Sequence, residues 1–106
     1  MARDWVVTSP TVLVALKANC DGCSAFHSGS LVALSEYDVV LVARSVRGVA
    51  ELESAPNVVY EAPELLDELG VRWPPAYVLI DGSPARVVFE GVAFAPEQVA
   101  DELSRR

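Results

Sequence analysis

The sequence contains only two cysteines and one histidine among its 106 residues. So few cysteines exclude a disulfide-rich secreted scaffold, and any dithiol chemistry must use Cys20 and Cys23 together. Basic residues are also scarce, because eight Lys and Arg stand against fifteen Asp and Glu and are dispersed along the chain. A net charge of −7 without a basic patch excludes the usual surface for nucleic acid or anionic lipid.

Long hydrophobic runs are missing as well, and the apolar run at residues 11–16 is too short to cross a bilayer. An apolar content of 52% with 22% charged residues is typical of a well-filled core and argues against disorder. The length predicts a single domain over residues 1–106. We expect a monomer in the cytoplasm, with a soluble domain of an anchored extracytoplasmic protein as the alternative.

The most informative stretch is the Cys-x-x-Cys motif formed by Cys20 and Cys23. It follows residues 11–18, which read as a strand buried on both faces, and precedes residues 24–36, which can be helical. Two intervening residues in a first helical turn bring the sulfurs within reach of a normal disulfide. At a helix N-terminus the first cysteine is favoured as a thiolate, whereas the second lies deeper. The pattern therefore predicts Cys20 as nucleophile and Cys23 as resolving thiol.

Residues 38–43 form a second all-apolar run, which indicates a central strand of a parallel sheet. The connection between the two apolar strands is long enough for a right-handed crossover. Weaker patterns predict a short edge strand at residues 4–7, helices at residues 45–54 and 63–69 and an extended piece at residues 57–60, with Gly70 capping the second helix.

Pro75 directly precedes a third apolar strand at residues 76–80. Because proline gives no ladder donor, it belongs at the start of the strand, where a cis peptide bond is the usual reason for its presence. Turn residues 81–84 and the alternating residues 86–90 predict an antiparallel hairpin. A last helix is expected to start within residues 94–97.

This order of elements resembles the thioredoxin fold, an α/β fold with a central mixed sheet flanked by helices and a C-terminal β-hairpin and helix. Residues 62–71 leading to residues 75–82 are similar to the membrane-anchored thioredoxin-like reductases of cytochrome maturation and to the accessory protein of methylamine dehydrogenase maturation. The resemblance implies that Cys20 attacks, Cys23 resolves, and the loop of cis Pro75 packs beside the disulfide and docks the substrate chain.

Three positions depart from that family. Asn19 replaces a frequent aromatic residue, and the usual Gly-Pro between the cysteines is Asp21 and Gly22 here. Val14 stands where many thioredoxins carry a buried carboxylate that takes the proton of the resolving thiol. The residue before Pro75 is itself a proline, Pro74, so it offers no backbone N–H to an extended substrate.

Other readings of the same residues remain open. Trp73 is either a packing residue or, with Pro74 and Pro75, part of a substrate groove. His27 lies one turn beyond Cys23, where it could act as a proton acceptor, but a lone histidine on an early helix face is more often a solvated surface residue. A zinc or copper site would need Cys20, Cys23 and His27, perhaps with Asp21, which leaves a closed tetrahedral site incomplete.

We therefore predict a thiol-disulfide oxidoreductase on the reducing side, with no cofactor and no metal. Its partners would be a protein disulfide or dithiol of narrow range and an unidentified recycling reductase. Asp21, Gly22 and His27 would modulate the dithiol. A non-catalytic binding module of the same fold and a metal-handling protein are the alternative hypotheses.

Overall fold

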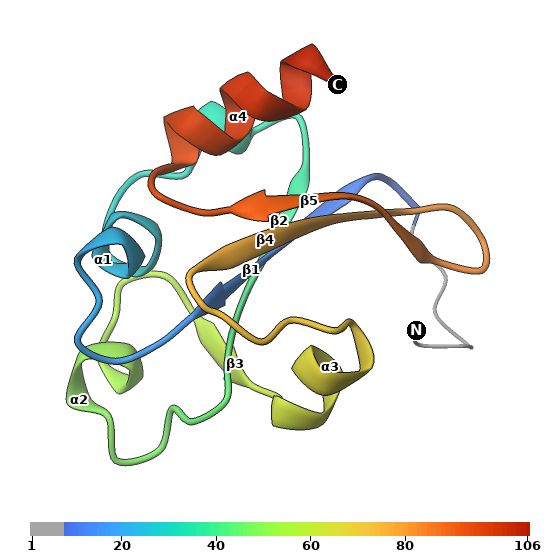
Figure 1. Cartoon of the computed structure of the whole chain (residues 1–106). Coiled ribbons are helices and arrows are strands. Elements are labelled where there is room, and N and C mark those ends of the chain that lie inside the picture. The colour runs from blue at the N-terminus through green and yellow to red at the C-terminus, as the bar shows by residue number, and fades with distance from the viewer. Residues whose placement is uncertain (1–7) are drawn as a thin grey trace.

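The computed structural model describes residues 8–106, so the strand expected at residues 4–7 lies outside the described residues. Five strands form one sheet in the order β3-β2-β1-β4-β5 (Figure 1). They are β1 (Thr11–Leu16), β2 (Asp38–Ala43), β3 (Val59–Glu61), β4 (Ala76–Asp81) and β5 (Arg86–Val92). The helices are α1 (Asp21–His27), the 3-10 helix η1 (Val32–Leu34), α2 (Ala50–Glu53), α3 (Pro63–Glu68) and α4 (Pro96–Arg105). Because β1 pairs parallel with β2 and antiparallel with β4, the expected mixed sheet is confirmed.

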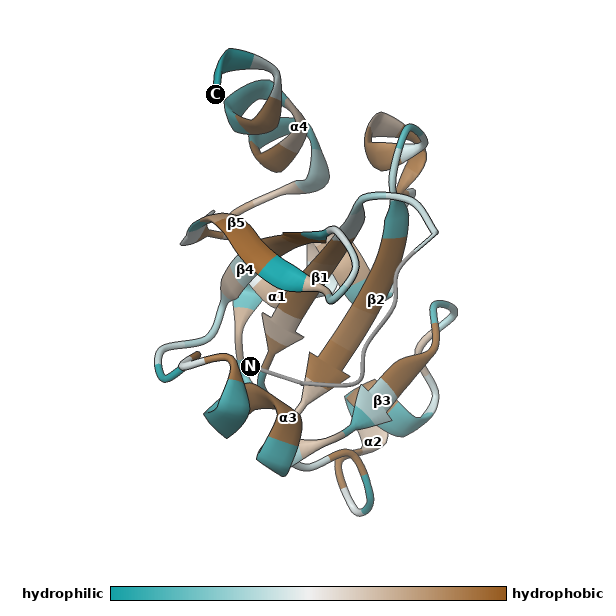
Figure 2. Ribbon diagram, turned by 90° about the vertical axis from the view of Figure 1, so that its right-hand side faces the viewer, coloured by the Kyte–Doolittle hydropathy of each residue, from teal (hydrophilic) through white to brown (hydrophobic). Residues whose placement is uncertain are grey.

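Strand β1 lies at the centre of the sheet and separates two apolar cores. Val12 and Val14 face one core, which includes side chains of α1 and α4, whereas Leu13 and Ala15 face the other, which includes Leu66 of α3. The helices accordingly lie on both sides of the sheet (Figure 1), and Figure 2 shows the central strands as the apolar interior. This double burial explains why β1 and β2 carry no polar alternation.

The helix after the cysteines differs from the expected residues 24–36. Helix α1 begins three residues earlier and ends at His27, and only the short η1 follows. A Cβ on Gly29 would lie 2.4 Å from the Ala25 carbonyl oxygen, so the backbone there has a course that only glycine permits. Residues 28–30 are exposed, and η1 then returns the chain to the core, where Leu34 is fully buried.

The helix expected at residues 45–54 is also shorter, because α2 spans Ala50–Glu53 alone. Gly48 has a positive φ of 83°, which ends any regular helix at that point. The preceding N–H groups of Val46 and Arg47 donate to the Glu61 side chain at 2.7 and 3.0 Å instead of joining a helix.

The second half of the chain follows its predicted pattern closely. Strands β4 and β5 form the antiparallel hairpin, α3 is followed by Gly70 with a positive φ of 74°, and α4 begins at Pro96. The last helix is the longest, with ten residues. Within residues 8–106, no helix is long and apolar enough to cross a membrane.

Candidate redox site

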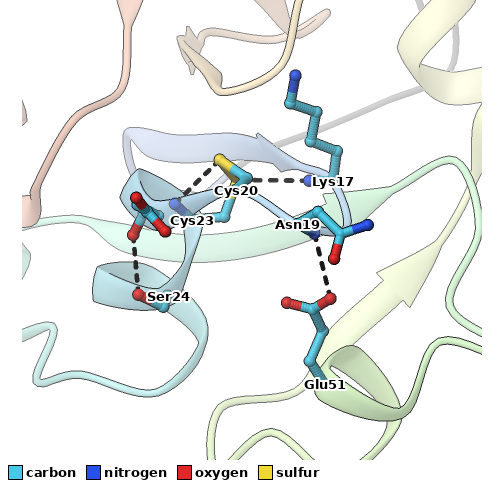
Figure 3. Close-up of a disulfide and its surroundings, with 7 residues drawn as sticks. Lys17, Asn19, Cys20, Cys23, Ser24 and Glu51 are labelled. Atoms are coloured by element: carbon cyan, nitrogen blue, oxygen red, sulfur yellow. Dashed lines mark hydrogen bonds between the residues drawn. A yellow bond between two sulfur atoms is a disulfide. The ribbon is translucent and has the colours of Figure 1, made fainter.

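Cys20 is the N-cap residue of α1. Its backbone is extended, with φ −130° and ψ 113°, and its sulfur accepts a hydrogen bond from the Cys23 N–H at 3.2 Å (Figure 3). This contact satisfies one of the free N–H groups of the first turn, as an N-cap side chain does. The same contact would stabilise a thiolate at Cys20, because an N–H donor and the start of a helix both favour negative charge on sulfur.

The two cysteines form a disulfide and differ sharply in exposure. Their Cα atoms lie 5.2 Å apart, within the usual range for a disulfide. Cys23 is completely buried, and its sulfur accepts from the Lys17 N–H at 3.4 Å, whereas Cys20 is only partly buried (Figure 3). The site therefore presents one partly exposed cysteine and one buried cysteine.

Asn19 turns the chain from the β1 end into α1. It has φ 55°, the only positive value of a non-glycine residue within residues 8–106, and asparagine tolerates this conformation better than most residues. Its N–H donates to the Glu51 carboxylate of α2 at 3.2 Å (Figure 3). Glu51 thus holds the residue next to Cys20.

Three segments that are distant in sequence meet around the disulfide. A Cβ on Gly22 would lie 3.6 Å from the carbonyl oxygens of Ala93 and Phe94, so the Cys-x-x-Cys turn packs against the connection from β5 to α4. The Ala93 N–H donates to the Pro75 carbonyl at 3.2 Å. The Pro74–Pro75 peptide bond is cis, which confirms the expectation for Pro75.

Pro74 and Trp73 line different grooves. Pro74 lines a groove of about 170 Å³ together with residues 16–18, which lead to the cysteines, and the start of the β2–α2 connection. Trp73 is 85% exposed and lines a second groove of about 300 Å³ beside β4 and β5. Asp21 is exposed on the first turn of α1, whereas the apolar Val14 is fully buried in β1.

The connection from β2 to α2 forms the far wall of the Pro74 groove and is held by carboxylates. Glu61 accepts the N–H groups of Val46 and Arg47, and these hydrogen bonds lower the pKa of the Glu61 carboxyl. Arg44, which lines the groove, donates to Asp67 at 2.5 Å, and this bond lowers the pKa of the Asp67 carboxyl.

His27 corrects the expectation of a solvated surface position. Its side chain is 4% exposed on the inner side of α1, its Nδ1 lies 2.7 Å from the Ser28 hydroxyl, and its buried Nε2 has no hydrogen-bond partner within residues 8–106. In the same part of the chain, no group of three or more His, Cys, Asp or Glu residues is arranged to hold a metal ion.

Two residues near the site were not identified from the sequence. Glu51 reaches Asn19 across 32 positions, and no local pattern marks that contact. The sequence pattern marks Phe94 only as the start of the last helix, yet its side chain is 65% exposed and its backbone packs against Gly22. A large apolar residue between the end of an alternating strand and a helix start was the one available signal.

Comparisons with known proteins support the fold. No protein-family model matches the chain, and no curated protein matches it. Among solved structures, it is similar to the crystal structure of the pneumococcal exposed lipoprotein thioredoxin Etrx1 from Streptococcus pneumoniae strain TIGR4. The match has 18% sequence identity and a TM-score of 0.61, and it covers 98% of this chain and 87% of that one. The chain therefore has the thioredoxin fold, with a Cys-x-x-Cys disulfide at the start of its first helix.

Proposed function

We propose that this protein carries out thiol-disulfide exchange with a protein partner through Cys20 and Cys23. The unequal exposure of the two cysteines is the observation that carries the proposal. In the reduced protein, the Cys20 thiolate attacks one sulfur of a partner disulfide and releases the other partner sulfur as a thiolate. Cys23, after losing its proton, attacks the Cys20 sulfur and releases the second partner thiolate. Two electrons pass to the partner, and the Cys20–Cys23 pair is left as a disulfide. A separate reductase then reduces this disulfide back to the dithiol.

The proposed direction of electron flow is toward the partner disulfide. A carboxylate at Asp21 opposes the Cys20 thiolate, and Val14 supplies no acceptor for the Cys23 proton, so neither residue stabilises the reduced thiolate form. The disulfide should therefore resemble the reducing members of the fold, which lie near roughly −270 mV, more than the oxidising ones, near roughly −120 mV. Gly22 and His27 are the other proposed modulating residues, through the packing of Gly22 against the Ala93 and Phe94 carbonyl oxygens and the burial of His27.

The proposed docking residues are Trp73, Pro74 and Pro75. The groove beside Pro74 supports a role in receiving an extended partner segment, because it adjoins the residues that lead to Cys20. Pro74 lacks a backbone donor, which supports a narrow substrate range. The proposed function is closest to that of the reductases of cytochrome maturation and the methylamine dehydrogenase accessory protein, which the sequence resembles at residues 62–71 and 75–82.

We propose the cytoplasm as the compartment and a monomer as the working form. An extracytoplasmic domain of an anchored protein is the alternative, which the likeness to an exposed lipoprotein supports. Cell fractionation followed by immunoblotting distinguishes these compartments. The oxidation state of the Cys20–Cys23 pair would not, because the proposed reductase returns the pair to the dithiol in either one.

Two single-cysteine variants test the mechanism. Cys23→Ser leaves the accessible thiol, so it should alkylate rapidly near neutral pH and accumulate a mixed disulfide with a disulfide substrate. Cys20→Ser leaves only the buried thiol and should do neither. Mass spectrometry of the trapped species and iodoacetamide rates provide the measurements. Equal alkylation rates in the two variants would show that the assigned roles are wrong.

The alternative of a non-catalytic binding module predicts a different result in one assay. An oxidoreductase should accelerate insulin reduction by dithiothreitol, even if slowly, and Cys20→Ser should abolish that acceleration. A binding module should give the rate of the reductant alone in both proteins.

A further inference from the structure

An exposed apolar row ends beside Gly22 of the Cys-x-x-Cys turn. It consists of Trp73, Val92 and Phe94, whose side chains are 85%, 51% and 65% exposed. Trp73 and Val92 line the same groove of about 300 Å³, and Phe94 follows Val92 with the buried Ala93 between them. Isolated exposed apolar residues are normal on a protein surface, but a row beside a reactive group indicates an interaction site.

The row is continuous with the redox site through its backbone. Gly22, which lies between the cysteines, packs against the carbonyl oxygens of Ala93 and Phe94. Pro75 accepts the Ala93 N–H, so the docking loop and the apolar row are directly joined. A protein segment whose cysteine reaches Cys20 therefore passes next to Phe94.

The backbone of Phe94 is held rigidly from α4 by one side chain. The Gln98 amide oxygen accepts the N–H groups of Phe94 and Ala95 at 2.7 and 3.2 Å. The amide nitrogen of Gln98 donates to the Val92 carbonyl at 2.8 Å and to the Glu102 carboxylate at 2.7 Å. A backbone fixed in this way needs no ordering when a partner binds, so the entropic cost of binding at this position is confined to the Phe94 side chain.

The charges around the row indicate the chemistry of the partner. The two segments that meet at Gly22, residues 19–23 and 92–98, contain the exposed acids Asp21 and Glu97 and no basic residue, so the Phe94 end of the row is acidic. Basic residues lie farther along, where Arg72 lines the Trp73 groove together with Glu90 and Lys17 precedes the cysteines. The whole chain is also acidic, with a net charge of −7. A partner segment with a cationic residue beyond its apolar anchor is thus favoured over an acidic one.

We propose that Phe94 is a specificity-determining residue that selects partner segments with a large apolar side chain next to the reacting cysteine and a Lys or Arg beyond it. The proposal rests on the proposed thiol-disulfide exchange and names its substrate class. The apolar anchor of the partner packs on Phe94 and toward the Trp73 groove, while its cysteine meets Cys20.

Matched peptide disulfides test this selection. Each short peptide carries one cysteine joined to 5-thio-2-nitrobenzoate, and attack of Cys20 on the peptide sulfur releases the coloured thiolate. One peptide has Phe beside the cysteine and Lys beyond, a second replaces the Phe with Ala, and a third replaces the Lys with Glu. The reduced full chain is compared with Phe94→Ala and with the control Val88→Ala, whose residue is 43% exposed on β5 and does not line the Trp73 groove.

The wild-type chain should react about tenfold faster with the Phe peptide than with the Ala peptide, as expected for one buried aromatic anchor. Phe94→Ala should reduce this ratio to within about twofold of unity, whereas Val88→Ala should keep it. The Glu peptide should react more slowly than the Lys peptide, and the difference should shrink at high salt. Iodoacetamide rates should be equal in all three proteins, because that reagent needs no groove.

A ratio that Phe94→Ala leaves unchanged, with normal exchange by the wild-type chain, overturns the proposal for Phe94 alone. Absence of exchange with every peptide, although iodoacetamide reacts, overturns the proposed function instead. Equilibrium sedimentation is the second measurement: a wild-type dimer that Phe94→Ala dissociates would assign the row to self-association and overturn its assignment to a partner. A monomer in both proteins agrees with the proposal.

Discussion

Restoring a backbone donor at Pro74 should increase activity on generic disulfide substrates. Pro74 lines the groove of about 170 Å³ that adjoins residues 16–18, and an extended partner segment placed there meets a carbonyl but no N–H at this residue. A single neutral hydrogen bond contributes about 0.5–1.5 kcal/mol, which corresponds to roughly two- to twelvefold in affinity. Pro74→Val and Pro74→Ala both restore the N–H, and both should raise the rate of insulin reduction within that range.

The pair of variants separates the donor from the side chain. If only Pro74→Val gains activity, the added contact of the valine side chain is responsible and the reasoning from the missing N–H is wrong. The reduction potential of Cys20–Cys23, measured against glutathione, should stay nearly unchanged in both variants because neither alters the charge around the sulfurs. Thermal unfolding shows whether each variant remains folded. No gain in two folded variants would show that the absent donor does not limit docking.

Two further predictions concern charged groups near the site. Asp21→Asn should lower the pKa of the Cys20 thiol and make the disulfide modestly easier to reduce, because it removes a negative charge beside the thiolate at an exposed position. A thiol titration that shows no change or an increase would contradict this electrostatic reasoning. Glu61 has a pKa lowered in the folded state from an ordinary value of 4.5, so its stabilising effect is complete above that value and is lost as the pH falls through the folded-state pKa. Urea unfolding across this pH range should therefore show wild type losing more stability than Glu61→Gln, and a constant difference between them would refute the assignment.

The sequence predicts the sheet better than the helices that surround it. Residues 38–43 were expected as a strand and form one with those same bounds, because an apolar run of that length has few other stable arrangements. Helix boundaries depend on single residues and on distant acceptors. At residues 45–49 the local pattern was helical, but the N–H groups of Val46 and Arg47 bind the Glu61 carboxylate fifteen and fourteen positions away. Local propensity carries no information about such an acceptor.

His27 shows a different cause of error. Cys23, Phe26 and His27 stand at the i, i+3 and i+4 positions of one helical face, and all three are buried. The periodicity therefore indicated burial of His27, and its polarity led to the opposite expectation. In this helix the spacing predicts burial better than residue polarity does, because the buried residues of the short α1 all lie at this spacing.

Some features of the site depend on neighbouring residues in the sequence, and others depend on contacts between distant residues. The spacing of Cys20 and Cys23 and the proline before β4 are local, so the dithiol and the cis bond at Pro75 were predictable. The surroundings that would decide partner and reactivity are not local: Glu51 reaches Asn19 from α2, and Phe94 reaches Gly22 from the end of β5. Because a fold fixes the backbone of such contacts while leaving their side chains free to vary, specificity in this molecule is expected to reside in residues that no motif marks.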